Sequence, residues 1–307
     1  MHAIKKLIKG MPHAVDFLVR VNRGQGIGFS FNLSDRCPVG CDCYWRAMGR
    51  VKELSDEAII RFFEARRDEG LKLVTIIGGE PYVRRGLLPK ITPIMPANWL
   101  VTSGTTPLLH LPKTTHFVSI DGKDADTHDR VRKMPGLYVR ILKNLTKARA
   151  EGKFPVFIHS VLNALNYWQV KEMLSLWREN GLVDGIAFSL VTRIRSDGYS
   201  DDLLLKREQR AEVIAELLRL KSEFGPFLAM SSAMIQHMHP SLTEAQSVKN
   251  CGTAQFVASY DASGERIPQC IFSDKGDCSQ CGCVITPMVE TLGNLGTIKL
   301  MAHLYTP

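Results

Sequence analysis

The stretch IGFSFNLSDRCPVGCDC (residues 27–43) is the most informative part of this 307-residue sequence. Residues 27–34 predict a β-strand, and the loop after it carries Cys37, Cys41 and Cys43. Three thiolates would leave one iron of a four-iron cluster open to a small molecule, as a catalytic cluster requires. A structural zinc would need a fourth Cys or His nearby, and none lies within about ten residues after Cys43.

The sequence downstream alternates short β-branched runs with amphipathic stretches. Strands are predicted at 73–79, 98–104, 116–122, 155–164 and 185–192, and helices at 56–70, 136–152, 167–181 and 201–225. Six strands joined by helical crossovers predict an α/β fold, a parallel sheet that is open or curled into a partial (β/α)6 TIM-like barrel. The chemistry is then expected at the carboxyl ends of the strands.

Composition excludes several classes of protein. With 45% hydrophobic and 23% charged residues the chain reads as globular, and it contains no run long enough to span a membrane. Despite a formal charge of +8, no basic block or aromatic–basic RNA motif is present, so no nucleic-acid partner is expected. The N-terminus lacks a secretory signal, and we expect a cytoplasmic protein.

Residues 1–25 form an amphipathic helical segment with lysines between the apolar positions. This helix either packs on the body of the protein or contacts anionic lipid as a peripheral membrane segment. Residues 26–235 are expected to form the barrel. From about residue 236 the alternation stops, and we expect 236–307 to be a loop-rich small domain folded around a metal.

The C-terminal segment holds the other cysteines. They are Cys251, Cys270, Cys278, Cys281 and Cys283. Such clustering in a cytoplasmic chain favours metal binding over disulfides. Cys278 and Cys281, with two residues between them, have a spacing often used to bind one cluster.

Taken together, these motifs resemble radical S-adenosylmethionine (SAM) enzymes with a SPASM or Twitch auxiliary domain. The resemblance rests on the first cysteine loop, on Gly78-Gly79-Glu80-Pro81 after the second strand, on Ser119-Ile120-Asp121-Gly122 after the fourth strand, and on the cysteine-rich C-terminus. It implies SAM, two 4Fe-4S clusters and an electron donor such as flavodoxin or ferredoxin. The segment from Val118 to about Leu190 looks most like hopanoid adenosyl transferases and enzymes acting on peptides or small molecules, so the substrate is a lipid, another small molecule or a peptide.

The first cysteine motif departs from the family pattern. The usual spacing is Cys-x3-Cys-x2-Cys, whereas this chain has Cys-x3-Cys-x1-Cys, with Tyr44 where the third cysteine is expected. Cys43 must therefore serve as the third ligand. The resemblance also implies an aromatic contact to the SAM adenine, which Tyr44 or Trp45 would provide.

Positions carried over from the family give a set of SAM-binding residues. Gly78 to Pro81 would receive the amino group of SAM, with Glu80 as a carboxylate or backbone acceptor, and Ser103 and Ser119 would supply hydroxyls. Arg140 is a candidate for the methionine carboxylate, and a solvated helix arginine is the alternative. Asp121 is either a helix N-cap or part of the site.

The family also suggests ligands for the auxiliary cluster. Its hairpin pattern, Cys-x9-15-Gly-x4-Cys, is matched with one extra residue by Cys251, Gly264 and Cys270, with the turn at 261–264. Together with Cys278 and Cys281 these two cysteines would hold a 4Fe-4S cluster, with Cys283 as the substitute ligand. The alternative reading is a non-catalytic zinc protein with a nucleic-acid or protein partner.

Overall fold

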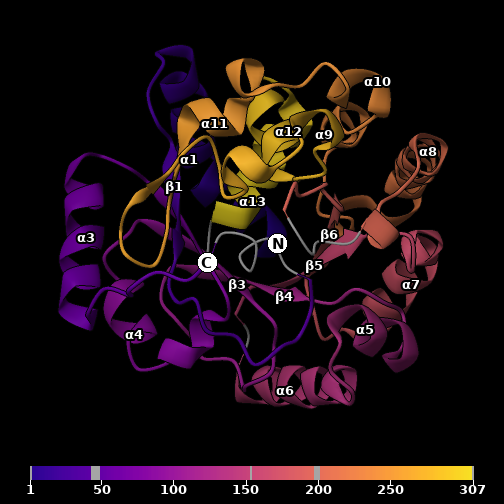
Figure 1. Cartoon of the computed structure of the whole chain (residues 1–307), viewed down its shortest axis with the longest axis horizontal. Coiled ribbons are helices and arrows are strands. Elements are labelled where there is room, and N and C mark those ends of the chain that lie inside the picture. Colours follow the sequence, from indigo (N-terminus) through magenta and orange to yellow (C-terminus); the bar gives the residue numbers. More distant parts are fainter. Residues whose placement is uncertain (1, 43–48, 153, 197–200, 306–307) are drawn as a thin grey trace.

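One eight-stranded sheet organises the computed structural model of this chain, in which residues 2–42, 49–152, 154–196 and 201–305 are described (Figure 1). The strands are β1 (Gly28–Asn32), β2 (Leu73–Ile77), β3 (Ala97–Thr102), β4 (Thr114–Ser119), β5 (Val156–Leu162), β6 (Gly185–Leu190), β7 (Val257–Tyr260) and β8 (Arg266–Ile267). Their order is β6-β5-β4-β3-β2-β1-β7-β8, parallel throughout except for the antiparallel β7–β8 pair. The six predicted strands are present, and the predicted parallel α/β sheet is confirmed.

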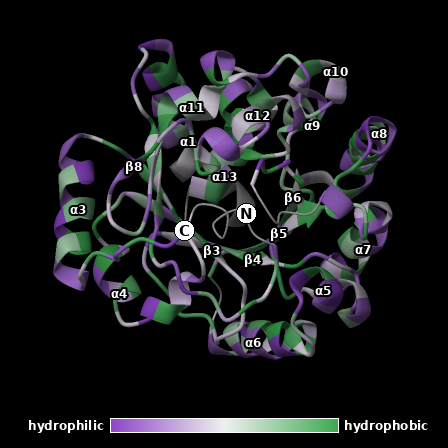
Figure 2. Cartoon of the chain, in the orientation of Figure 1, coloured by the Kyte–Doolittle hydropathy of each residue, from purple (hydrophilic) through white to green (hydrophobic). Residues whose placement is uncertain are grey.

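The strands are buried on both sides, as a parallel sheet covered by helices requires. Every residue of β1, β4 and β6 is buried. The helices around the outside of the sheet are α3 (Asp56–Asp68), α4 (Leu88–Ile91), α5 (Ala125–Arg132), α6 (Leu137–Glu151), α7 (Val170–Asn180) and α8 (Arg207–Phe224). Figure 2 shows hydrophilic and hydrophobic residues alternating along these helices, which accounts for their amphipathic sequence pattern.

The helices from α3 to α8 form an arc that stops short of a full circle, and the C-terminal part of the chain lies in the opening (Figure 1). This part contains α9 (Ser232–His237), α10 (Pro240–Thr243), α11 (Gly252–Phe256), α12 (Ile285–Glu290) and α13 (Leu295–Tyr305). The expectation of a loop-rich segment is therefore wrong. Most of these helices are too short to show a clear helical period in the sequence, and buried contacts with the barrel core stabilise them.

The C-terminal segment also extends the main sheet, because β7 pairs in parallel with β1 over Gly28 to Phe31. The predicted hairpin is present: β7 and β8 are antiparallel, and Asp261 Oδ1 accepts the Ser263 and Glu265 backbone N–H groups in the turn between them. Segment 236–307 thus shares the sheet of the barrel. Its boundary as a separate domain stays a prediction.

Short 3-10 helices connect many of these elements. They are η1 (Pro81–Arg84), η2 (Tyr167–Gln169), η3 (Asp201–Leu203), η4 (Gly225–Phe227), η5 (Val248–Asn250), η6 (Ser273–Lys275) and η7 (Cys278–Gln280).

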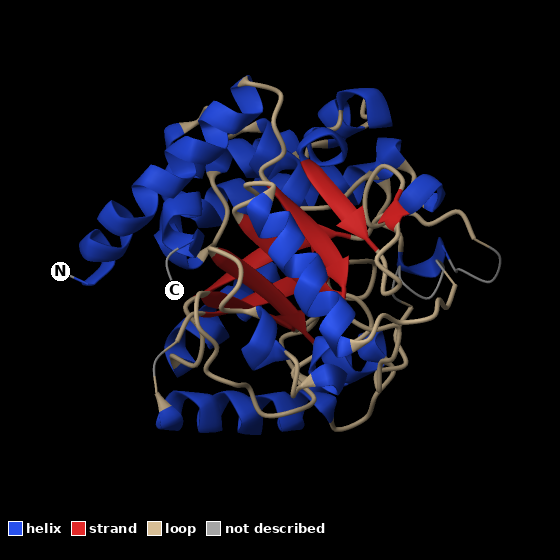
Figure 3. Ribbon diagram, turned by 90° about the vertical axis from the view of Figure 1, so that its left-hand side faces the viewer, coloured by secondary structure: helices blue, strands red, loops and turns tan. Residues whose placement is uncertain are grey.

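The N-terminal helix α1 (His2–Asn22) packs on α13. The His13 ring stacks on Tyr305 at 4.2 Å between centroids, and Phe17 meets the same tyrosine edge-on at 5.3 Å. Val15 and Val19 remain 44% and 38% exposed on the other side of the helix. Figure 3 shows the first turns of α1 at the periphery, apart from the sheet. Among the described residues no helix is both long and apolar enough to cross a bilayer.

Candidate functional site

A cavity of about 340 Å³ extends from the carboxyl ends of the strands into the partial barrel. Residues two positions apart on one strand share a face, and such pairs line the cavity, among them Thr75 with Ile77 in β2 and His159 with Val161 in β5. The volume falls in the range of small-molecule sites, which begins at about 300 Å³. The cavity therefore lies at the strand ends where the sequence predicted the chemistry, and the roles of its residues stay predictions.

The first cysteine loop follows β1 and borders this cavity. Cys37 and Cys41 both line it, and the Val39 backbone N–H donates to Cys37 Sγ at 3.4 Å. Lys133, at the end of α5, contacts both carboxylate oxygens of Asp42 at 2.7 Å and so ties the loop to that helix. Cys43 and Tyr44 lie outside the described residues, and their roles stay predictions.

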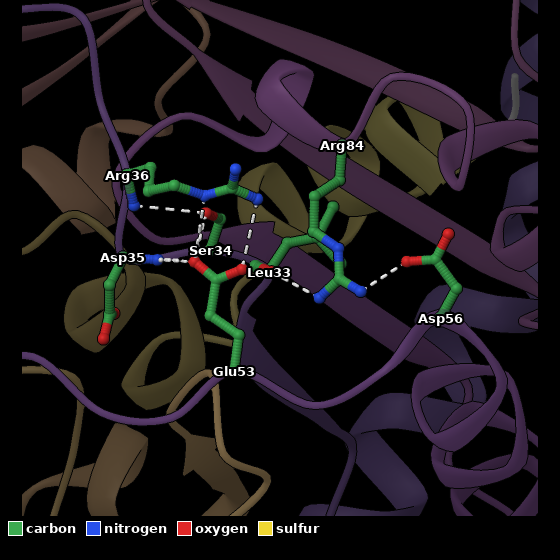
Figure 4. Close-up of polar contacts among 7 residues, drawn as sticks. All are labelled: Leu33, Ser34, Asp35, Arg36, Glu53, Asp56 and Arg84. Atoms are coloured by element: carbon green, nitrogen blue, oxygen red, sulfur yellow. Dashed lines mark hydrogen bonds and ion pairs between the residues drawn. The ribbon is translucent and has the colours of Figure 1, made fainter.

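Glu53 joins the chain before the cysteine loop to the chain after it (Figure 4). Its Oε1 accepts the Ser34 hydroxyl at 2.6 Å and the Asp35 backbone N–H at 3.0 Å, and Arg36 forms an ion pair with its Oε2 at 3.3 Å. Burial acts to raise the pKa of Glu53, but these hydrogen bonds and the Arg36 cation hold it below its ordinary value. No sequence motif predicted this contact.

The two glycines after β2 approach the same loop closely. The Gly79 N–H donates to the Ser34 carbonyl oxygen at 2.7 Å, and a Cβ at Gly79 would stand 2.4 Å from the Arg36 carbonyl oxygen. Gly78 has φ +125°, a conformation that other residues rarely adopt. Both glycines line the cavity, so their backbone is open to a ligand there.

Glu80, the third residue of this motif, is 1% exposed, and its carboxylate accepts hydrogen bonds from neighbouring residues of the protein. It accepts the Thr102 hydroxyl at 2.7 Å, the Ser103 N–H at 2.6 Å and the Tyr82 N–H at 3.0 Å, and the Ser103 hydroxyl also donates to it. These bonds fix the ends of β2 and β3 relative to each other. Glu80 and the buried Pro81, which begins η1, are not among the lining residues.

The other residues carried over from the family are divided between the cavity and the surface. Ser103 and Ser119, at the ends of β3 and β4, line the cavity. Arg140 lies on the exposed side of α6 and is not a lining residue. An exposed helix position was the alternative weighed for this arginine.

A different arginine reaches the cavity. Arg132, the last residue of α5, forms an ion pair with Asp121 at 2.7 Å between Nε and Oδ2, and both side chains line the cavity. Asp121 Oδ1 also accepts the Val161 N–H, whereas the N-cap of α5 is Asp124. The sequence analysis missed Arg132. The signal available was that a buried Asp121 would require a cation nearby.

A neutral histidine lies on the neighbouring strand, where His159 pairs with Ser119 of β4. His159 of β5 and Ser189 of β6 are 2.9 Å apart between Nε2 and Oγ, and both line the cavity. Burial lowers the pKa of His159 to about 4, so the imidazole is uncharged at neutral pH. The sequence analysis did not identify either residue.

The five C-terminal cysteines line the same cavity as the first loop. All five are free thiols. Burial raises the pKa of Cys270, Cys281 and Cys283 to about 12 each, and neighbouring cysteine charges act in the same direction. Thiolates at these positions would require compensating positive charge, which a metal cluster supplies. The five thiols are donors of the type that an iron–sulfur cluster uses, but within the described residues no group of three or more His, Cys, Asp or Glu side chains is close enough to hold a metal ion.

Backbone hydrogen bonds hold the Cys278–Cys283 segment against the chain that follows β6. The Leu190 N–H donates to the Gly282 carbonyl oxygen and the Gly282 N–H to Thr192 Oγ1, both at 2.9 Å. The Asp277 N–H donates to Arg193 O at 2.9 Å. Since β7 pairs with β1, the C-terminal part of the chain contacts both edges of the six-stranded arc.

Comparisons with known proteins agree with this architecture. No protein-family model matches the chain. The AdoMet-dependent heme synthase of Methanosarcina barkeri (strain Fusaro / DSM 804) is 28% identical over 181 residues, covering 55% of this chain and 52% of that protein. The chain thus spans about half the length of this curated relative.

Two solved structures share the fold over most of the chain. Streptococcus suis SuiB bound to precursor peptide SuiA superposes with a TM-score of 0.63 at 13% identity, covering 93% of this chain and 74% of SuiB. The enzyme anSMEcpe with bound AdoMet and Cp18Cys peptide gives 0.61 at 14% identity, covering 92% and 84%. The chain therefore has the fold of SuiB and anSMEcpe. Its partial barrel and cysteine-rich C-terminal region are those of this fold, as the sequence predicted.

Proposed function

We propose that this chain is a radical SAM enzyme that cleaves SAM reductively and uses the resulting 5′-deoxyadenosyl radical to functionalise a substrate. One observation carries the proposal: Cys37 and Cys41, the glycines Gly78 and Gly79, and the C-terminal cysteines all line one cavity. Together with Cys43, the first two cysteines would hold the SAM-cleaving 4Fe-4S cluster with one iron open to SAM.

Cluster and SAM together would supply the one-electron cleavage of the sulfonium C–S bond and the radical. The chain's own residues would bind and orient SAM. The glycine backbone would approach its amino group, while Ser103 and Ser119 would present hydroxyls. Arg132 is better placed than Arg140 to meet its carboxylate, because only Arg132 reaches the cavity. Glu80 would act by holding Ser103 in place, and Tyr44 remains the candidate for adenine contact.

We further propose that residues 236–307 form the SPASM- or Twitch-type auxiliary unit. Cys251, Cys270, Cys278 and Cys281 would hold a second 4Fe-4S cluster, with Cys283 as the substitute. The hairpin brings Cys251 and Cys270 to one side of the cavity, and the Cys278–Cys283 segment brings the others.

The substrate is proposed to be a small molecule, such as a lipid, or a peptide. Most of the surface that lines the cavity is apolar, which would suit a substrate with an apolar body, as in hopanoid adenosyl transferases. SuiB and anSMEcpe bind peptides, which keeps a peptide substrate as the second candidate. An electron donor such as flavodoxin or ferredoxin would reduce the first cluster. A cytoplasmic protein touching membranes through the exposed valines of α1 would suit a lipid substrate.

The test is anaerobic reconstitution followed by metal and product analysis. The chain is expected to hold roughly eight irons and eight sulfides, as two four-iron clusters, and to release 5′-deoxyadenosine with dithionite and SAM. Cys41→Ala and Cys43→Ala should each abolish that release, while the matched control Cys283→Ala keeps it. Stoichiometric zinc without sulfide would instead support the zinc-binding alternative.

A further inference from the structure

A buried arginine of α8 contacts the auxiliary cysteine segment, and none of the roles above uses it. Arg210 is 6% exposed. Its NH1 group donates to the Gln280 carbonyl oxygen at 2.9 Å and its NH2 group to the Cys281 carbonyl oxygen at 2.6 Å. The guanidinium therefore spans the peptide units at the proposed ligand Cys281.

The charge of Arg210 is not matched by a carboxylate in the described part of the chain. Within the described residues its guanidinium donates to the two carbonyls, and the nearby Glu244 is paired with Arg207 at 2.6 Å. Burying a cation without an anionic partner is unfavourable, because the charge loses its hydration. An anion close to Cys281 would remove that cost.

The cysteine thiolates can provide this anion. A four-iron cluster held by four thiolates carries net negative charge, and accepting an electron makes it more negative. A fixed cation beside it stabilises the reduced form more than the oxidised form, since the attraction grows with the negative charge. Burial strengthens this effect because little water screens it.

Resting on the proposed auxiliary cluster, we propose that Arg210 is a positioning residue that holds the Cys281 loop and raises the reduction potential of that cluster. One electron enters from an external low-potential donor. No covalent bond forms or breaks in this electron transfer, and Arg210 stays protonated before and after it.

The experiment is a redox titration of the full chain followed by electron paramagnetic resonance, with dithionite as the reductant. Cys37→Ala and Cys41→Ala are introduced together to remove the first cluster, so that the signal comes from the auxiliary cluster alone. Arg210→Gln removes the charge, and Arg210→Lys keeps it. Arg219→Gln is the control. This substitution removes the same charge from the same helix, but at a side chain that is 54% exposed.

At the wild-type midpoint potential, Arg210→Gln should lower the ratio of reduced to oxidised cluster about tenfold, equal to about 59 mV for one electron. Arg210→Lys and Arg219→Gln should stay close to the wild-type ratio. An unchanged ratio in Arg210→Gln, with its auxiliary iron intact, overturns the inference and leaves the proposed function standing.

Iron analysis separates the remaining outcomes. If Arg210→Gln holds no auxiliary iron, Arg210→Lys decides: a wild-type ratio supports the role of the charge, and a tenfold fall or loss of iron overturns it. Absence of auxiliary iron in the chain with Arg210 intact would instead overturn the proposed auxiliary cluster, and the inference with it.

Discussion

Gly282→Ala should detach the auxiliary cysteine segment from the barrel. A Cβ at Gly282 would stand 1.9 Å from the Leu190 carbonyl oxygen and 2.4 Å from the Leu190 carbonyl carbon. Real Cβ atoms essentially never come closer than 3.0 Å to such atoms. The contact is with backbone on both sides, so a side-chain rotation cannot relieve it, and the two segments must separate by about 1 Å.

That separation would break the two hydrogen bonds that join the segments here. Leu190 N to Gly282 O and Gly282 N to Thr192 Oγ1 are both 2.9 Å, and about 1 Å more exceeds hydrogen-bond range. Each buried polar group left without a partner costs about 1–3 kcal/mol. Counted as one such cost for each of the two hydrogen bonds, the loss is about 2–6 kcal/mol, or roughly 4–12 °C in apparent unfolding midpoint at about 2 °C per kcal/mol for a chain of this size.

Iron content and thermal unfolding at one scan rate would measure the effect. Gly282→Ala should lose the auxiliary iron while keeping the first cluster. Gly293→Ala is the matched control, because its Cβ would have no heavy atom within 4 Å. If the two variants had equal iron and equal midpoints, the segment's attachment to β6 would not support the cluster.

Three further changes test other parts of the site. Cys281→Ala should lose auxiliary iron while Cys283→Ala keeps it; the reverse iron counts would exchange the two ligands. Glu53→Gln should destabilise the protein by about 1–2 kcal/mol and lower the iron content of the first cluster, because it removes the charge that Ser34, Asp35 and Arg36 contact. The control Glu212→Gln, at an exposed position, should change neither the stability nor the iron content. The hydrogen bond with Glu290 raises the pKa of His237. The stability that this pair contributes is therefore fully present below the ordinary pKa of 6.5 and is lost as pH rises through the raised pKa. The difference in unfolding midpoint between wild type and His237→Gln should shrink on going from about pH 6 to about pH 9, and a constant difference would contradict the pairing.

The barrel could be predicted from local patterns because its strands are short runs rich in β-branched, aromatic or aliphatic residues and are bounded by turn residues. β2 was expected at 73–79 and spans Leu73–Ile77, and β6 was expected at 185–192 and spans Gly185–Leu190. Parallel strands joined by helices then leave few topologies open. The position of the cavity at the carboxyl ends of the strands followed from the same rule.

The contacts that complete the site had no local pattern. Arg132 lies in α5 and Arg140 in α6, both after the fourth strand, and only the packing of these helices decides which arginine faces the cavity. Glu53 meets Ser34 across the cysteine loop, and Arg210 meets Cys281 across 71 residues. Such pairs depend on tertiary packing, so a single sequence could not reveal them.

The way the C-terminal segment is attached connects the two cysteine groups. Backbone pairing of β7 with β1 fixes the chain on the side of the first cysteine loop, and the bonds from Gly282 to Leu190 and Thr192 fix it on the far edge. The auxiliary cysteines thereby become part of the cavity wall that also contains Cys37 and Cys41. Under the proposed function, a substrate at the first cluster would lie in the cavity whose wall the auxiliary segment helps to form, so a substitution that loosens this segment should change both the proposed auxiliary cluster and the shape of the cavity.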